Sequence, residues 1–173
     1  RELSGWDAGA IAGFARRGGD GWQIAIQPPT RALRAALYCR AVLTRQSETY
    51  VTRIAVAVGK GQMPLKPVAN PNAGHGPAFT ASGRLLEELD RHVHLAHASG
   101  GAVSAAFRLA DQIAQGWTRA QARALCHTLP PDSGPRAETA ELLGITREAV
   151  NQALWAAGYR AIGDAIEMLE AAP

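Results

Sequence analysis

Residues 18–43 read GGDGWQIAIQPPTRALRAALYCRAVL, and their pattern decides how the first part of the chain folds. Trp22, Ile24 and Ile26 alternate with other residues, which predicts a strand entered through a glycine-rich turn. Two prolines stop this strand, and Thr30 is expected to cap a helix with apolar residues at helical spacing. The fold therefore starts with a strand followed by an amphipathic helix.

The segments that follow continue the alternation of strands and helices. Residues 51–58 read VTRIAVAV, a β-branched and nearly all-apolar run that predicts a strand covered on both faces. Residues 62–77 are rich in Pro, Gly and Asn and lack periodicity, which predicts a long loop. We expect a helix over 78–91, a short strand over 93–98 and a helix over 102–115. This order predicts an α+β domain over residues 1–115.

Composition places the chain among ordinary globular proteins. Its 173 residues are 47% hydrophobic and 19% charged, a balance that supplies a core and argues against disorder. No apolar run approaches the ~20 residues that cross a bilayer, and the start has no signal segment. We expect a soluble, cytoplasmic protein with no membrane partner.

Cysteine and histidine give no metal-ligand pattern. Cys39 and Cys126 lie far apart, so we expect buried free thiols rather than a disulfide or a zinc site. His92 and His94 would share one face of a strand while His97 points the other way, so the three are not expected to converge on a metal.

Gly19, Asp20 and Gly21 lie between two extended segments, which predicts Asp20 at the tip of a β-hairpin. A carboxylate there could hold a divalent metal that carries triphosphate oxygens. The same tripeptide also makes an ordinary turn, because Asp and Gly are common turn formers. Both interpretations stay open on these residues alone.

The run over 18–43, followed by TRIAVAVGKG at 52–61 and GPAFTASGRLL at 76–86, resembles the class III adenylate and guanylate cyclases. Their signature is a GDG-aromatic hairpin, a helix with an RAL..AL stripe, an R-I-G-I-x-x-G strand and a helix with N-x-x-x-R. The resemblance covers about residues 10–100. It implies a ferredoxin-like βαββαβ sheet domain and a face-to-face homodimer.

The resemblance assigns roles to four residues. Asp20 falls on a metal-binding aspartate, and Arg84 falls on the catalytic arginine that steadies the transferring phosphates. Arg16 replaces a base-reading lysine, and Thr80 replaces a ribose-orienting asparagine. These four would form a nucleotide-binding set for ATP or GTP with Mg²⁺ or Mn²⁺.

The front of the chain departs from the cyclase pattern. The family's first strand and first metal aspartate should lie well upstream of Asp20, but only 19 residues precede it. Two-metal phosphoryl transfer needs two carboxylates. Either that strand has been removed from this sequence, or the domain is a degenerate, non-catalytic relative, which is the explanation that we favour. A ferredoxin-like core with no ligand is the plainer alternative.

After Gly116 the pattern changes to short helices around a turn-rich segment at 129–135, which predicts an all-α domain over 116–173. Within it, residues 136–159 read RAETAELLGITREAVNQALWAAGY. The small, glycine and β-branched residues Ala140, Gly144 and Val150 have the spacing of a helix-turn-helix. The segment resembles the repressor-like and winged helix-turn-helix families.

The second helix of this pair is the expected recognition helix. Thr146 should cap it, and Arg147, Glu148, Asn151 and Gln152 should face outward toward double-stranded DNA. Arginine suits guanine, and asparagine or glutamine suits adenine. An ordinary helical bundle used for protein contacts remains the alternative.

Net charge does not decide between these alternatives. The chain carries +3, but residues 1–115 hold 13 Lys and Arg against 8 Asp and Glu, whereas residues 116–173 hold 5 against 7. Phosphate neutralisation normally supplies much of DNA affinity, so the balance of the second part favours protein contacts. Trp155 is expected to pack against the final helix, and Trp117 lies too far from the motif to be assigned to nucleic acid.

Together these features predict a bacterial DNA-binding transcriptional regulator, in which a degenerate cyclase-like domain drives dimerisation or senses a nucleotide. The layout also resembles the SatD-type family of bacterial proteins. The alternative from another class is an active class III cyclase that makes a cyclic nucleotide from ATP or GTP. A third is a pure interaction protein.

Overall fold

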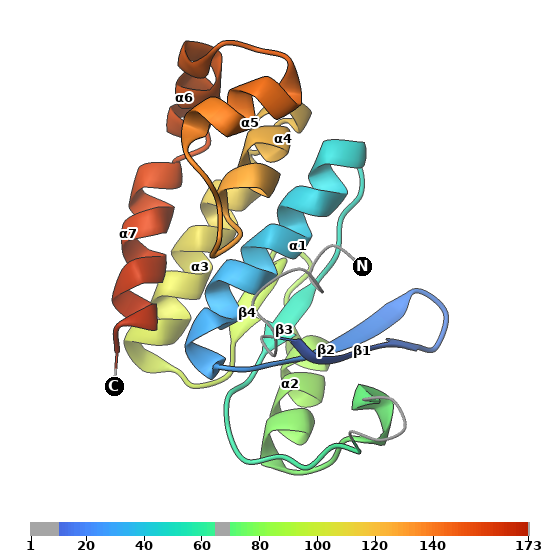
Figure 1. Cartoon of the computed structure of the whole chain (residues 1–173). Helices are drawn as coiled ribbons and strands as arrows, with labels where there is room; N and C mark the ends of the chain where they lie inside the picture. The colour runs from blue at the N-terminus through green and yellow to red at the C-terminus, as the bar shows by residue number, and fades with distance from the viewer. Residues whose placement is uncertain (1–10, 65–69, 173) are drawn as a thin grey trace.

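A computed structural model describes residues 11–64 and 70–172. Within them, seven α-helices and two two-stranded sheets form a mixed fold that is about 57% helical (Figure 1). The prediction that helices and strands mix in one chain is confirmed. The ferredoxin-like layout stays a prediction, because the described strands form two separate pairs rather than one four-stranded sheet.

An antiparallel hairpin of β1 (Ile11–Arg17) and β2 (Gly21–Ile26) opens the described chain. Gly18 and Gly19 both have a φ of 49°, a left-handed conformation that favours glycine. A Cβ on Gly21 would clash with the carbonyl oxygen of Arg17. Asp20 lies at the tip as predicted, and the turn alone accounts for the glycines around it.

Helix α1 (Ala32–Gln46) follows the hairpin and supplies much of the core. The predicted Thr30 cap is wrong, because the two prolines begin a 3₁₀ turn, η2 (Pro29–Arg31), which runs directly into α1. Leu33, Leu37 and Ala41 are at most 1% exposed on the inner face of α1. The burial of these side chains is what stabilises α1, because its start has no side-chain cap hydrogen bond.

The second pair of strands is shorter than predicted. Strand β3 (Ile54–Val56) lies parallel to β4 (Leu95–His97), and the ends of the predicted 51–58 strand, Val51 and Val58, are more than half exposed. Only Ile54 of β3 is buried, and among the described residues β3 pairs with β4 alone, so it lies at an edge rather than in the middle of a sheet. The prediction of a long covered strand is therefore wrong.

The loop and helix between these strands follow the prediction in outline. The loop contains a 3₁₀ turn, η3 (Pro71–Ala73), while residues 65–69 lie outside the described residues. Helix α2 (Pro77–Glu88) ends before the predicted residue 91. The Oδ1 of Asp90, two residues beyond the end of α2, accepts the backbone N–H of His92 at 2.8 Å.

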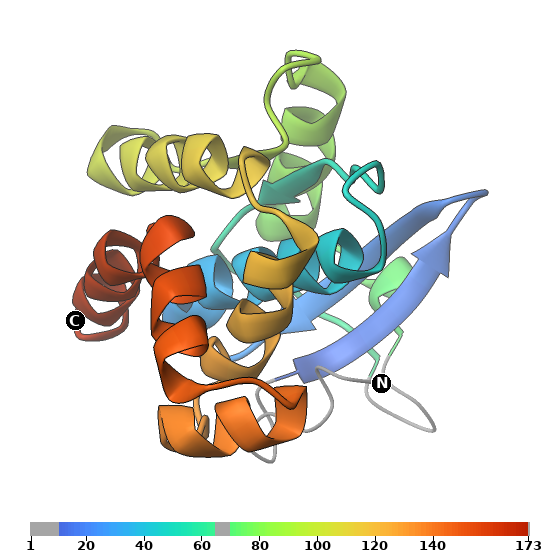
Figure 2. The same ribbon diagram turned by 90° about the horizontal axis from the view of Figure 1, so that it is seen from above.

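Five helices complete the chain: α3 (Gly101–Gln115), α4 (Arg119–Thr128), α5 (Arg136–Leu143), α6 (Arg147–Ala156) and α7 (Tyr159–Glu170). They gather on one side of α1, with the hairpin on the other (Figures 1 and 2). None of the helices described is both long and apolar enough to cross a membrane.

One core crosses the predicted boundary near Gly116. A single cluster of buried side chains runs from α1 through α3 and α4 to α7, and α1 packs along α4. Trp117, only 4% exposed, donates its indole N–H to the carbonyl of Ala157 at 2.9 Å. Division of the chain into 1–115 and 116–173 remains a prediction about sequence pattern, because the described parts share buried surface.

Candidate nucleic-acid interface and ligand sites

Helices α5 and α6 form the predicted helix pair. Gly144 ends α5 in the left-handed conformation, with a φ of 65°, and turns the chain toward α6. Ala140 and Val150 are buried between the helices, so the three residues occupy the packing and turning positions that their spacing predicts. The Thr146 hydroxyl accepts the backbone N–H of Ala149 at 3.1 Å, which confirms the predicted cap.

The predicted base-reading residues lie on α6 as expected. Arg147, Glu148 and Gln152 are exposed, and Asn151 is half-buried. Val150 and Leu154, by contrast, face the core at 0% and 2% exposure. Helical periodicity thus separates an inner apolar side from an outer polar side at the N-terminal end of α6.

Asn151 has a partner that sequence reasoning missed. The Arg136 guanidinium, at the start of α5, donates Nη1–H to the Oδ1 of Asn151 at 2.8 Å. This bond fixes which amide atom is the oxygen and leaves the NH₂ group available as a donor. No local spacing connects the two residues, since they lie 15 positions apart and meet only when α5 and α6 pack.

The prediction for Trp155 is wrong. Its side chain is 80% exposed rather than packed against α7. It follows Gln152 by three residues and Asn151 by four, so it extends the outer face of α6 by one helical turn. The periodicity of the helix was sufficient to find this position. Trp117 is the indole that packs, held by Ala157.

The cyclase-derived residues divide into two places. Arg16 and Asp20 are exposed on the hairpin, where the backbone carbonyl of Arg16 accepts the side-chain amide of Asn72. Thr80 and Arg84, one turn apart on α2, line a hollow of about 640 Å³. Neither hairpin residue lines that hollow, and the hairpin tip and α2 lie apart in both views (Figures 1 and 2).

Asp20 does not belong to a cluster of three or more metal-ligating side chains within the described residues. Nowhere in the described ranges do three His, Cys, Asp or Glu side chains gather so that they could hold a metal. Asp20 is exposed at a turn whose glycines are required by the backbone.

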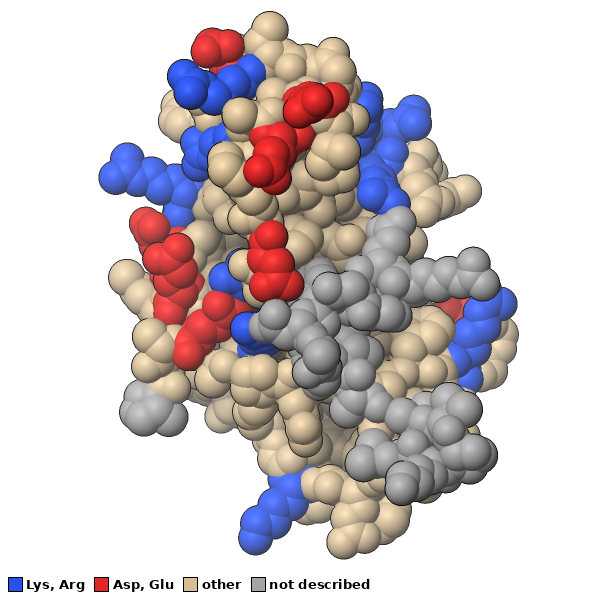
Figure 3. Space-filling model, viewed as in Figure 1, with Lys and Arg blue, Asp and Glu red and all other residues tan. Residues whose placement is uncertain are grey.

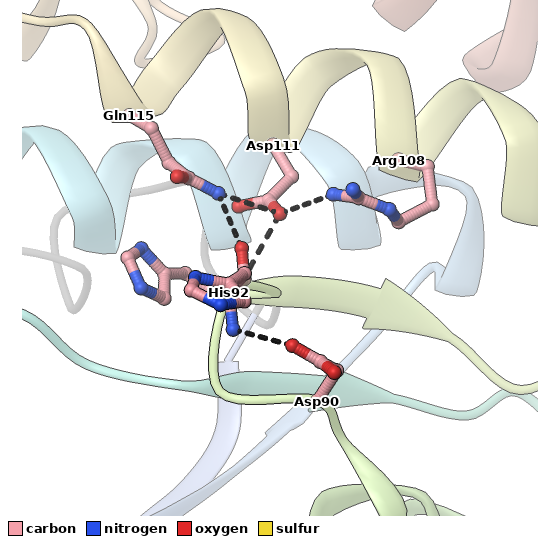
Figure 4. A network of polar contacts seen from close by, with 6 residues as sticks. Asp90, His92, Arg108, Asp111 and Gln115 are labelled. Carbon is pink, nitrogen blue, oxygen red and sulfur yellow. Dashed lines mark hydrogen bonds and ion pairs between the residues drawn. The ribbon is translucent and has the colours of Figure 1, made fainter.

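A polar network ties the start of β4 to α3 (Figure 4). The Oδ2 of Asp111, a residue 2% exposed, accepts the backbone N–H of His94 at 3.2 Å, the Nη1 of Arg108 at 2.6 Å and the side-chain amide of Gln115 at 3.0 Å. Gln115 also donates to the carbonyl of His92. These bonds satisfy the buried carboxylate and position the loop before β4.

Burial shifts the pKa values of histidine and cysteine side chains near this core. Burial lowers the pKa of both His94 and His97, and nearby Arg40 adds to the effect at His94. Cys39 and Cys126 are not joined in a disulfide within the described residues, and of the two only Cys126 is buried by its exposed area. Burial of the sulfur raises the pKa of Cys39 to about 12, so this thiol stays protonated at neutral pH.

The assignments of nucleotide and DNA binding thus depend on the sequence motifs and on where the structure places their residues. Of the cyclase-derived residues, Thr80 and Arg84 meet in one hollow. The DNA-directed residues all lie on α6 or at its cap. No protein-family model, curated protein or solved structure matches the chain.

Proposed function

We propose that the chain is a bacterial transcriptional regulator that binds double-stranded DNA through α6. The observation that carries this proposal is the outer face of a short, Thr146-capped helix, which follows a left-handed glycine and presents polar side chains at its N-terminal end. In helix-turn-helix proteins the N-terminal residues of the second helix contact base edges in the major groove.

Three of the outward residues, Arg147, Asn151 and Gln152, have a base that suits their chemistry. The guanidinium of Arg147 can donate two hydrogen bonds to guanine, and the amides of Asn151 and Gln152 match adenine. Arg136 supports this by orienting the Asn151 amide before DNA arrives. The free N–H groups of the first turn of α6 are suited to a backbone phosphate.

A homodimer would compensate for the lack of net positive charge on α5 and α6, where two arginines stand against three glutamates. Two copies would contact two half-sites about one helical turn apart, which doubles the phosphate contacts without a larger surface on each copy. The cyclase resemblance independently implies a pair of chains. We therefore propose a two-fold symmetric operator as the partner.

The test selects bound sequences from a random duplex library with the full chain and then measures affinity by fluorescence anisotropy. Arg147→Ala should cost about 1–3 kcal/mol of binding free energy and relax sequence preference at one position. Arg160→Ala is the matched control, because Arg160 is an exposed arginine on α7. No enriched sequence, or equal loss in both variants, would overturn the proposal.

A nucleotide site on α2 is the second candidate function, supported by the hollow that Thr80 and Arg84 share. An arginine beside a hydroxyl on one helical face suits phosphate and sugar oxygens. ATP and GTP, each with Mg²⁺ or Mn²⁺, should then bind without turnover and bind more weakly to Arg84→Ala. A cyclic product that disappears in Asp20→Ala would replace the regulator with the active cyclase.

A further inference from the structure

A second hollow, of about 440 Å³, lies where α1, α4 and α5 meet. Its lining comprises Arg45, Gln46, Arg119, Arg123, His127 and Leu143. In Figure 3 blue side chains gather at the upper right of the molecule, over the ends of α1 and α4. The hollow is therefore a concave and strongly basic part of the surface, and it contains none of the residues assigned to DNA or nucleotide.

The fold itself brings these basic side chains together. Arg119, Arg123 and His127 follow one another at intervals of four, so they share one face of α4. Arg45 comes from the last turn of α1, which packs along α4. Arg119 also donates Nε–H to the backbone carbonyl of Arg45 at 3.4 Å, which joins the start of α4 to the last turn of α1.

The charge of this cluster is only partly balanced. Glu48 supplies one negative charge beside the cluster, where its Oε1 accepts the backbone N–H of Arg119 at 2.8 Å. Arg123 makes no hydrogen bond or ion pair with any residue in the described ranges. Because like charges four residues apart destabilise a helix, this arrangement carries a cost that a bound anion would remove.

We propose that this hollow binds phosphate groups. Guanidinium groups offer parallel N–H donors that match two phosphate oxygens, and several of them line one concavity here. Gln46 adds an uncharged amide, and Leu143 adds one apolar contact, a lining that suits a phosphate ester better than a hydrophobic ligand. The phosphate belongs either to a small phosphorylated ligand or to the backbone of bound DNA.

The hollow lies between α1 and the helices that support α6, so a ligand bound there would contact both. One wall is α1, in the part of the chain that resembles a cyclase, and the other is α4 and α5, against which α6 packs. A phosphate bound across these walls would hold the recognition helix pair against α1. The site is separate from α6, so it does not depend on the proposed function.

The first experiment titrates inorganic pyrophosphate into the full chain by isothermal calorimetry. Saturable binding is expected, with a roughly tenfold or greater loss in the double variant Arg119→Ala/Arg123→Ala. Both side chains are exposed, so the variant should keep its fold, which circular dichroism checks. Arg160→Ala, which alters an exposed arginine on α7 that belongs to no proposed site, is the control and should bind as wild type does.

The second experiment distinguishes the sources of phosphate with a random-sequence duplex at increasing salt. If the DNA backbone occupies the hollow, the slope of log affinity against log salt should fall by about one for each arginine removed. An unchanged slope with weakened pyrophosphate binding assigns the site to a small ligand. If the double variant changes neither measurement, the phosphate site is overturned. DNA reading by α6 is judged separately, by the sequence preference of Arg147→Ala.

Discussion

Replacing Glu170 with glutamine should loosen α7 from α1. The Arg34 guanidinium donates Nε–H to the Oε1 of Glu170 at 2.6 Å and Nη2–H to its Oε2 at 2.8 Å, a bidentate ion pair. Its third group, Nη1, donates to the carbonyl of Leu129 at 3.0 Å. This one arginine therefore connects α1, the end of α4 and the last turn of α7.

The expected magnitude follows from how much of the pair is exposed. The side chains of Arg34 and Glu170 are 13% and 24% exposed, so water reaches them only in part. Exposed pairs contribute about 0–1 kcal/mol, whereas breaking a buried pair costs about 3–5 kcal/mol. We expect Glu170→Gln to cost about 2 kcal/mol between these limits, or about 4–8 °C in Tm for a chain of this size.

Urea unfolding followed by circular dichroism measures this change. A double-mutant cycle with Arg34→Met should give a coupling energy of about 1–2 kcal/mol. Glu167→Gln is the control, because Glu167 lies one turn earlier on α7 and is exposed. A coupling below about 0.5 kcal/mol would refute the reasoning that this pair holds the helix. Two separate unfolding transitions would show that the parts do not share one core.

Three further changes test other contacts. Thr146→Ala removes the cap of α6 and should cost about 1 kcal/mol of stability while weakening DNA binding, as unfolding and anisotropy would show. Trp117→Phe leaves the Ala157 carbonyl without its donor and should cost about 1–3 kcal/mol in the same unfolding assay. The Nδ1 of His97 accepts the backbone N–H of Ser99, and burial lowers the pKa of His97 in the folded chain. Below pH 6.5 the unfolded chain therefore binds a proton at this residue more readily than the folded chain does, so the free energy of unfolding falls. His97→Gln should reduce that acid loss, which unfolding at about pH 7.5 and about pH 5.5 would measure; an unchanged pH slope would contradict it.

The helix pair of the candidate interface could be predicted from the sequence, because the residues that define it act over short distances along the chain. A hydroxyl at the start of α6, a glycine after α5 and apolar residues at helical spacing act within one or two turns of the chain. The same spacing also placed Trp155 on the outer face, but the expectation that a large indole must pack overrode it. Its 80% exposure shows that periodicity was the better guide.

Contacts between distant segments could not be predicted from spacing. The bond from Arg136 to Asn151 and the basic hollow formed by Arg45 with Arg119 depend on which helices lie side by side. The prediction of a covered strand over 51–58 was wrong because burial depends on neighbouring elements that the segment itself does not encode. Residues 1–10 of the predicted first domain lie outside the described residues.

By itself the sequence determined the order of helices and strands, the glycine turn at Asp20 and the capped, two-sided helix α6, since each depends on dihedral preferences and on periodicity within a short segment. Only the tertiary structure decided that one core spans both parts of the chain, that Thr80 and Arg84 share a hollow without Asp20, and that arginines from α1 and α4 converge. The physical reason is that burial and charge clustering arise when helices pack, and packing joins residues that are far apart along the chain.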